Sequence, residues 1–589
     1  MSAGRTEPAR RPRAAAIVAG ALAFGVLWGV AEALWLVAPT LVERHHLAPR
    51  TLAHWGALAT ILVAMSVTIA VVLSFVPAVI VLAWQAIRTR PYRRPELVLA
   101  LAPGPLMPLA YLILCMVIEA VFFRRTMSAP STAGILLGIS ALWLALRTTY
   151  ERVAHRPPYA SPRSVAIALA LCAMLGIVGL RVRYKPPRPT AASDARPLGA
   201  RDASDPTPLL FVGLDSGNWQ TIRPLMEAGR LPVLTHLMAT GVHGTVTGLW
   251  PPYWSGPAWA AIVTGHPREE TGVFSDLVVD APGLPPFNAP LPDEPLLNPF
   301  FYVEWRLLRA DLVALTPPPR AALGRPPFWE SLHRAGVDTA VIRFDFTEPP
   351  DDQATIVVSS RVGADTWEVV GVKSESAEVF APPELATDLA RLFSPTTPAD
   401  ATLPLRIART TARPPGRNGD LELQMLRTGL DIDQRSFAAA RFVVTRRPQT
   451  EVLALYLGGF DGVCHAFWPY RFPEAYGADA PGSDAVAAFG GVIDHYLEYL
   501  DQELGALLAV YRVPPNVILV SDHGHTASTE NPLWRGWHGR EGLFIAGGPA
   551  FVHRGDPMTV SYFEVVPTIF DVLGFAVPDG FHGSSRRQR

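Results

Sequence analysis

Two residues in one stretch of the sequence could perform chemistry together. Asp215 follows an apolar run at 209–212, and Ser255 precedes a predicted helix at 257–264. A carboxylate at the end of a strand can hold a cation, the cation lowers the pKa of a hydroxyl, and a helix N-terminus favours the resulting anion. The pair is a candidate metal-activated nucleophile, although an ordinary strand–loop–helix connection with a capping serine would contain the same two residues.

Further residues of metal-binding types follow other apolar runs. The runs at 452–457 and 517–520 each lead into a loop with an aspartate and a histidine, and another histidine lies between a tryptophan and a glycine. Ligands of open α/β sheets bind beyond the carboxyl ends of the strands, so we expect these side chains to meet at one edge. Histidine and carboxylate without thiolate are typical of catalytic zinc or manganese. The candidate ligands, with Asp215, are Asp461, His465, Asp522, His523 and His538.

Composition narrows the remaining possibilities. The chain has 589 residues, enough for two or more domains, and a formal net charge of −1, which gives no basis for a nucleic-acid partner. Its three cysteines, Cys115, Cys172 and Cys464, form no disulfide framework or thiolate zinc cluster. Charged residues make up only 17% and hydrophobic residues 49%, which predicts that part of the chain lies in lipid.

The first 186 residues are predicted to form a helical membrane domain of about five spans. Most of the apolar segments approach the roughly twenty residues that a bilayer core requires. Pro77 leaves open whether the second segment is one span or two, and the length of the first segment disfavours a cleaved signal peptide. The segments are 14–38, 55–87, 97–123, 133–146 and 165–180.

Arginine placement predicts the orientation of this domain. Arginine clusters precede the first segment and follow the second and fourth, so they share one side if the second segment is a single span. The N-terminus is then cytoplasmic, and the rest of the chain is periplasmic or extracellular, as part of an integral, multi-pass membrane protein. Arg124 and Arg125 oppose this orientation.

The rest of the chain is predicted to form a linker and an α/β domain. Residues 187–207 are rich in Pro and Ala and are predicted to form a tether. From 208 to 589, short buried strands alternate with helices, which predicts a mostly parallel central sheet covered on both faces. The Pro-rich range 282–435 is predicted to be an inserted cap. Expected strands are 209–212, 339–343, 452–457 and 517–520, and expected helices are 222–228, 232–239, 257–264, 327–335, 437–444 and 486–511.

The second part of the chain resembles the alkaline phosphatase superfamily, most closely its type I phosphodiesterase/nucleotide pyrophosphatase branch. The motifs that carry the resemblance occur in the family's order and span nearly all of the chain after residue 208; the first 186 residues lie outside it. The motifs are LDS at 214–216, WSGPAW…TGHP at 254–267, GFDGVCHAFW at 459–468, SDHGH at 521–525, the Trp-His-Gly site at 537–539 and VVPTIFDVLG at 565–574.

This resemblance implies a hydrolase of phosphate esters with two zinc ions. Attack by Ser255 would give a phosphoseryl enzyme that water then hydrolyses, and the backbone N–H of Gly256 could bind a phosphoryl oxygen. Manganese is the alternative metal, and the substrate would be a small phosphate ester or a lipid headgroup. Asp215, Asp522 and His523 would hold the ion that activates Ser255, and Asp461, His465 and His538 would hold the other.

One departure from the family pattern concerns the phosphoryl group. The family often continues after its TG-x-x-P segment with His-Gly-Ile and then an asparagine that contacts the phosphoryl oxygen. Here residues 271–276 read TGVFSD, so Asp276 is the nearest substitute and carries the wrong charge. The preference for diesters over monoesters is therefore open. His525 is an additional histidine, interpreted as a neighbour of the ligands or a bystander.

Other functions compete with the hydrolase. An external headgroup transferase, resembling the phosphoethanolamine transferases and lipoteichoic acid synthases, would use the same residues with an acceptor other than water. A sulfatase is disfavoured because the context of Ser255 lacks the formylglycine motif. A metal-stabilised scaffold would be expected to have lost a ligand, and all are present. A transporter is disfavoured because the membrane half shows no internal repeat. The natural substrate and the oligomeric state cannot be inferred from the sequence.

Overall fold

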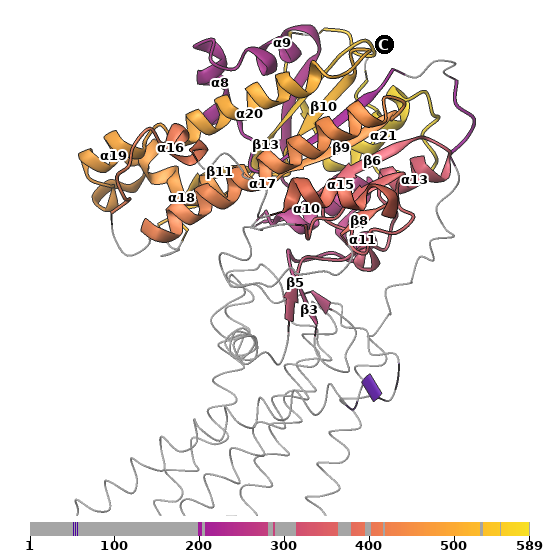
Figure 1. Ribbon diagram of the computed structural model, residues 1–589, viewed down its shortest axis with the longest axis horizontal. Helices are drawn as coiled ribbons and strands as arrows, with labels where there is room; N and C mark the ends of the chain where they lie inside the picture. The colour runs from indigo at the N-terminus through magenta and orange to yellow at the C-terminus, as the bar shows by residue number, and fades with distance from the viewer. Residues whose placement is uncertain are drawn as a thin grey trace, which may run out of the picture. The chain divides into compact units, whose positions relative to one another are not determined.

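Figure 1 shows a computed structural model of the chain. Contacts divide the chain into two units, one of Met1–Pro186 with Asp280–Val313 and one of Pro187–Val279 with Ala314–Arg589. In the first unit, β4 (Phe287–Asn288) is described. The described residues are 51, 53, 54, 56, 198–202, 207–251, 253–280, 287–288, 314–362, 379–394, 402–415, 419–529, 534–553 and 555–587.

The second unit is built on a nine-stranded sheet, with the strand order β14-β2-β13-β10-β1-β9-β6-β7-β8. Its central strands β10, β1, β9, β6 and β7 run parallel to one another. The strands are β1 (Leu209–Leu214), β2 (Val242–Thr247), β6 (Thr339–Ile342), β7 (Ile356–Val358), β8 (Phe380–Ala381), β9 (Val452–Leu457), β10 (Asn516–Val520), β13 (Glu541–Gly547) and β14 (Met558–Val560).

The expectation of a mostly parallel sheet is corrected to a mixed sheet. β13 pairs antiparallel with both β10 and β2, and β8 pairs antiparallel with β7. The described residues between β10 and β13 include no helix; the chain returns through the two-stranded sheet of β11 (Gly524–Ala527) and β12 (Gly536–Gly539). A strand that returns without a crossover helix pairs antiparallel with its predecessor. The hydrophobic run at 541–547 therefore has the opposite direction to its neighbour.

Helices cover both faces of the sheet because the central strands are apolar on both sides. All six residues of β1 are buried. Leu210 and Val212 pack into one hydrophobic core, and Leu209 and Phe211 pack into the other, as the alternation of side chains along a strand requires. Strands of this kind are typical of a sheet buried between two helical layers.

The first core is lined by several helices, of which the two longest, α17 and α20, run across the sheet in Figure 1. They are α8 (Trp219–Glu227), α9 (Pro232–Thr240), α15 (Pro383–Phe393), α16 (Leu403–Ala408), α17 (Gly419–Arg446), α18 (Gly459–Arg471), α19 (Ser483–Phe489) and α20 (Val492–Leu508). The opposite core contains α10 (Ser255–Thr264), α13 (Phe328–Arg334) and α21 (Val565–Val572).

Short elements complete the description. They are β3 (Val278–Asp280), β5 (Ala314–Thr316), α11 (Arg268–Thr271) and the 3-10 helices η3 (Arg320–Ala322), η4 (Pro473–Asp479) and η5 (Tyr562–Glu564). The four expected strands and the positions of the six expected helices are confirmed, with α17 beginning well before residue 437 and the range 486–511 divided between α19 and α20.

The range 282–435, for which we predicted a cap, contributes strands to the main sheet. β6, β7 and β8 all lie within it, and so does the beginning of α17. The predicted tether at 187–207 is described at 198–202 and 207, where Arg201 forms an ion pair with Glu451 and bridges to Phe575. The assignment of 187–207 as a tether and of 282–435 as a cap stays a prediction.

The expectation of a membrane domain is also corrected. Across the described ranges, none of the helices combines the length and the apolar character needed to cross a bilayer. This finding overturns the expected helical membrane domain at 1–186 and the integral, multi-pass localisation. A span needs about twenty apolar residues in one continuous helix, and an apolar segment of the sequence does not by itself establish such a helix. The five apolar segments lie, apart from residue 56, outside the described residues.

Candidate metal centre

Three parallel strands bring an aspartate each to one edge of the sheet. Asp215 follows β1, Asp461 lies in the first turn of α18 after β9, and Asp522 follows β10. Because β1 pairs in parallel with both β9 and β10, the loops after these strands lie side by side. The topology therefore explains how Asp215 meets Asp461 and Asp522, which lie 246 and 307 positions further along the chain.

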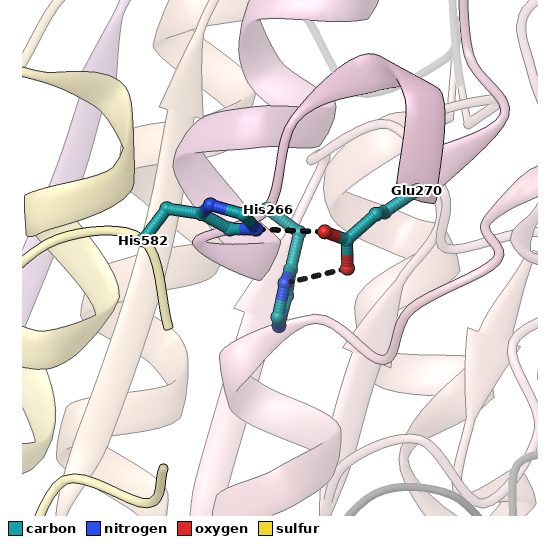
Figure 2. Close-up of side chains that lie close together, drawn as sticks. All are labelled: His266, Glu270 and His582. Atoms are coloured by element: carbon teal, nitrogen blue, oxygen red, sulfur yellow. Dashed lines mark hydrogen bonds and ion pairs between the residues drawn. The ribbon is translucent and has the colours of Figure 1, made fainter. Parts of the chain in front are cut away.

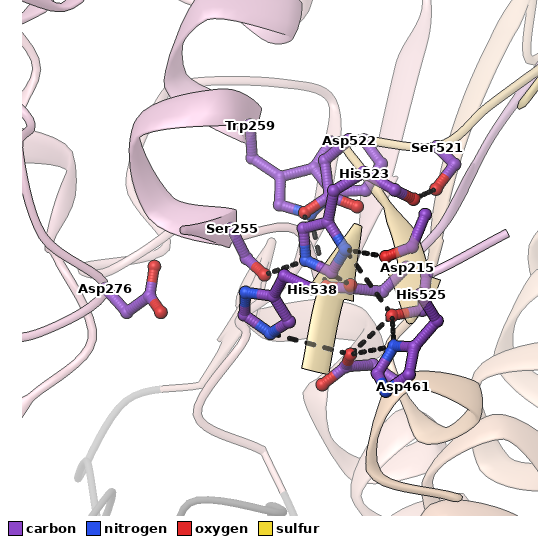
Figure 3. A network of polar contacts seen from close by, with 12 residues as sticks. Asp215, Ser255, Trp259, Asp276, Asp461, Ser521, Asp522, His523, His525 and His538 are labelled. Carbon is purple, nitrogen blue, oxygen red and sulfur yellow. Dashed lines mark hydrogen bonds and ion pairs between the residues drawn. The ribbon is translucent and has the colours of Figure 1, made fainter. Parts of the chain in front are cut away.

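Ser255 is the first residue of α10, and its hydroxyl points toward this edge (Figure 3). Its Oγ lies 3.0 Å from Nε2 of His523. The same nitrogen lies 3.5 Å from Oδ1 of Asp215 and 3.3 Å from Oδ2 of Asp522. The structure thus brings together the four residues for which the first metal position was predicted.

The second predicted set is also brought together. Nε2 of His465 lies 3.1 Å from Nε2 of His538 and 3.3 Å from Oδ2 of Asp461. The rings of His523 and His538 stack with centroids 3.9 Å apart, so the two sets adjoin. The histidines of both sets therefore present their nitrogens to one confined volume.

Several buried polar atoms in this volume lack hydrogen-bond partners. They are Oδ1 of Asp215, both carboxylate oxygens of Asp522 and Nδ1 of His538. A buried polar atom without a partner is costly unless something else satisfies it, and a cation does so for a carboxylate. Asp215, Asp522 and His523 form one group whose ligand atoms all lie within 4.8 Å of one another, and Asp461, His523 and His538 form another. The donor set fits zinc or manganese.

The charges of the site also favour a bound cation. Burial raises the pKa of Asp522 well above its ordinary value, and the charges of Asp215 and Asp461 raise it further. Burial, and next the charge of Asp461, also raise the pKa of Asp215. Burial alone would raise the pKa of Asp461, but its interactions with His465 and other histidines outweigh burial and hold it well below the ordinary value. Three clustered carboxylates therefore need positive charge to remain ionised together.

Two side chains that the sequence analysis missed hold Asp215 in place. The Tyr456 hydroxyl donates to Oδ2 of Asp215 at 2.5 Å, and Nε1 of Trp259 donates to the same oxygen at 3.3 Å. With Oδ2 held, Oδ1 remains directed toward His523. A signal was available for each: Tyr456 interrupts an apolar strand, and Trp259 follows Ser255 by four residues, so both lie on one face of α10.

Ser216 holds Asp461 in a similar way. Its backbone has φ of 63°, and its hydroxyl donates to Oδ1 of Asp461 at 2.5 Å. The same hydroxyl lies 2.9 Å from Nδ1 of His525, whose Nε2 is buried without a hydrogen bond. The additional histidine therefore contacts a residue that orients a candidate ligand. The LDS motif identifies Ser216, but its positive φ could not be inferred from the sequence.

The backbone N–H of Gly256, which we predicted to bind a phosphoryl oxygen, has a different partner in the structure. It donates to Oδ1 of Asp276 at 2.6 Å. Asp276 is buried, and burial raises its pKa well above the ordinary value. A carboxylate of this chain therefore occupies the anion-binding position at the start of α10.

Comparison with known proteins gives one family match. Residues 209–562 match the family described as Type I phosphodiesterase / nucleotide pyrophosphatase. A search of the curated proteins finds no significant match.

Solved structures give weaker likenesses. A mutant of the alkaline phosphatase PafA is 11% identical, with 65% of this chain and 99% of that chain covered and a TM-score of 0.42. Human ectonucleotide pyrophosphatase / phosphodiesterase 5 is 14% identical, with 64% and 97% covered and a TM-score of 0.34. Phosphonoacetate hydrolase from Sinorhizobium meliloti 1021 with phosphonoacetate is 14% identical, with 57% and 62% covered and a TM-score of 0.30. Likenesses at these TM-scores carry no weight beside the family match.

Proposed function

The chain belongs to the type I phosphodiesterase / nucleotide pyrophosphatase family and is a hydrolase of phosphoric esters, and on that premise we propose that Ser255 is its nucleophile. The observation that supports this role is the position of the Ser255 hydroxyl, at the first residue of α10 and 3.0 Å from His523 at the edge where Asp215 and Asp522 meet. A hydroxyl at a helix N-terminus beside clustered metal-binding side chains is suited to attack on phosphorus.

Two divalent cations fit the residues of the site, with zinc as the proposed identity and manganese as the alternative. When bound, they would supply Lewis-acid polarisation of the phosphoryl oxygens. Asp215, Asp522 and His523 would hold the ion beside Ser255, and Asp461, His465 and His538 would hold the other. The unpartnered oxygens of Asp215 and Asp522 support this assignment.

The reaction would proceed by two displacements at phosphorus. Oγ of Ser255 forms a bond to phosphorus while the bond to the leaving alcohol breaks, which gives a phosphoseryl ester. Water then attacks that phosphorus, releases the phosphate product and restores the Ser255 hydroxyl. Trp259 and Tyr456 keep Asp215 oriented throughout, because both donate to its Oδ2.

Asp276 supports a preference for diesters. Its carboxyl group already accepts the Gly256 N–H, and in its ionised form it places a negative charge where a phosphoryl oxygen would approach α10. A diester carries one negative charge at neutral pH and a monoester carries up to two, so a nearby carboxylate repels the monoester more. We therefore propose phosphodiesters as the preferred class of substrate.

The test is an activity panel on the full chain with zinc supplied. An aryl phosphodiester, an aryl phosphate monoester, a dinucleotide and a glycerophospho headgroup are compared, and products are identified by mass spectrometry. Hydrolysis of the diesters, with one phosphate-bearing product and one alcohol, is the expected result. Transfer of the phosphoryl group to an added alcohol with no hydrolysis would show a transferase instead. Absence of turnover on all four esters would overturn the proposal.

A further inference from the structure

A second cluster of metal-binding residue types shares no residue with the candidate centre and is drawn in Figure 2. His266 comes two residues after the end of α10, Glu270 lies in α11, and His582 lies near the C-terminus. Oε2 of Glu270 is 3.2 Å from Nδ1 of His266, and Oε1 of Glu270 is 2.7 Å from Nε2 of His582. One ligand atom of each residue lies within 4.8 Å of those of the other two. Two imidazoles therefore converge on one carboxylate.

His266 has the properties of an available ligand. Its side chain is buried, and its Nδ1 forms no hydrogen bond although Oε2 of Glu270 lies 3.2 Å away. Burial, and next the charge of Arg325, lower the pKa of His266 to about 4. The ring is therefore neutral at neutral pH, which is the form of imidazole that binds a metal.

Arg325 orients the carboxylate between the two histidines. Its Nε and Nη2 donate to Oε2 of Glu270 at 3.0 Å and 2.6 Å. Carboxylates that bind metals are commonly held by such an outer partner. This hydrogen bonding leaves Oε1 directed at His582, while the guanidinium charge weakens the attraction for a cation. We therefore expect a lower affinity here than at the three clustered aspartates.

We propose that His266, Glu270 and His582 form a third divalent-cation site, with zinc as the cation, that fastens the C-terminal segment to the end of the helix bearing Ser255. Tetrahedral zinc with bonds of about 2.1 Å separates its ligand atoms by about 3.4 Å, close to the distance between His266 and Glu270. The three ligand atoms already lie within 4.8 Å of one another, so small movements of the side chains would bring all three to one ion.

The packing beside the cluster shows what the cation would hold together. The Phe581 ring packs against the His266 ring with centroids 5.0 Å apart and an angle of 33° between the ring planes. A Cβ at Gly265, the residue that ends α10 with φ of 72°, would lie 2.6 Å from that ring. The C-terminal segment therefore already packs directly on the end of α10, and the cation would crosslink the two. None of these contacts depends on the proposed function.

The test measures metal content on the full chain. The parent protein and the variants His582→Ala, Glu270→Gln and Glu269→Gln are saturated with zinc chloride, dialysed and assayed by plasma mass spectrometry. We expect His582→Ala and Glu270→Gln each to carry one zinc ion per chain fewer than the parent. Glu269→Gln, a change at the exposed neighbouring carboxylate, should keep the parent's content. The difference between variants is informative however many ions the candidate centre holds.

A thermal readout separates binding from folding. The His582 side chain is 45% exposed, so its removal should leave the fold intact, as circular dichroism would verify. Zinc should raise the thermal unfolding midpoint of Glu269→Gln as much as it raises that of the parent. It should raise the midpoint of His582→Ala by less. Equal zinc content in His582→Ala and the parent would overturn the site, and so would equal zinc-dependent shifts in their midpoints.

Discussion

The Oγ of Ser255 and the Nε2 of His523 lie 3.0 Å apart although 268 positions separate them in the chain. Ser255 begins α10 on one face of the sheet, and His523 lies in the loop between β10 and β11. The contact places the only hydroxyl proposed as a nucleophile against a side chain that also approaches Asp215 and Asp522. Chemistry at this position depends on the register of β1 and β10.

Ser255→Ala should reduce phosphodiester turnover by about a thousandfold or more, because removal of a nucleophile leaves only binding and electrostatic contributions. Ser255→Thr, which keeps a hydroxyl, should retain more activity. Steady-state kinetics on an aryl diester measures both. Ser483→Ala, at the exposed start of α19, is the matched control and should match the parent. Undiminished turnover by Ser255→Ala would eliminate Ser255 as the nucleophile.

Asp522→Asn should lose metal as well as activity, because both oxygens of this carboxylate are buried without a hydrogen-bond partner. As the pH is lowered, metal binding should begin to weaken at a higher pH than it would with an ordinary aspartate. The reason is that the raised pKa of Asp522 lets protons compete with the metal for the carboxylate. Zinc content and diesterase activity are measured together between pH 5 and pH 9. Asp484→Asn, an exposed change in α19, serves as control. Activity that survives chelation and dialysis would contradict the metal-dependent mechanism.

Asp276→Asn should raise kcat/KM for an aryl monoester about tenfold relative to a diester. The amide keeps an acceptor for the Gly256 N–H but cannot carry the negative charge of the ionised carboxylate, and a tenfold change corresponds to about 1.4 kcal/mol. The ratio of the two specificity constants is the measurement. Asp276→Glu, which keeps the charge, should leave the ratio near that of the parent. A ratio that Asp276→Asn leaves unchanged would show that this carboxylate does not discriminate between substrates.

Asp433 should make stability depend on pH. It accepts hydrogen bonds from the Gly459 N–H at the start of α18 and from the Tyr496 hydroxyl of α20, and burial raises its pKa to about 7. The folded protein therefore holds a proton that the unfolded chain releases above its ordinary pKa of 3.8. The stabilisation is complete below that value and is lost as pH rises toward 7, by at most about 1.4 kcal/mol per pH unit.

Asp433→Asn cannot ionise and should remove this part of the pH dependence. Urea unfolding with chelator present, at pH 5 and pH 8, gives the free energy of unfolding in each case. The loss between the two pH values should be smaller in Asp433→Asn than in the parent. Asp420→Asn changes an exposed residue of the same helix and should behave as the parent does. Identical pH dependence in Asp433→Asn and the parent would refute the assignment.

The sequence predicted the features that depend on local patterns of apolar and polar residues. The central strands are continuous apolar runs, and the loops after them carry the aspartates and histidines, so their meeting at one edge followed from parallel pairing. The partners of those ligands were not predictable in the same way. Tyr456 reaches Asp215 from a neighbouring strand, and the loop that brings Asp276 to Gly256 has no periodic pattern.

Two expectations were overturned. Apolar segments in the first 186 residues suggested bilayer spans, but none of the helices in the described part of the chain is long and apolar enough to cross a bilayer. The sheet was expected to be mostly parallel, but the strand at 541–547, which was not among the expected strands, pairs antiparallel after the short return through β11 and β12. The direction of a strand depends on its connection, which an apolar run does not encode.

The burial of α10 has a consequence for how substrates are distinguished. Nine of its ten residues, from Gly256 to Thr264, are buried, and only Ser255 at its start is partly accessible. A helix enclosed in this way has little freedom to reorganise during a turnover, so the nucleophile keeps its geometry whatever ester arrives. Differences in rate among substrates would therefore report how well each ester aligns with an immobile hydroxyl.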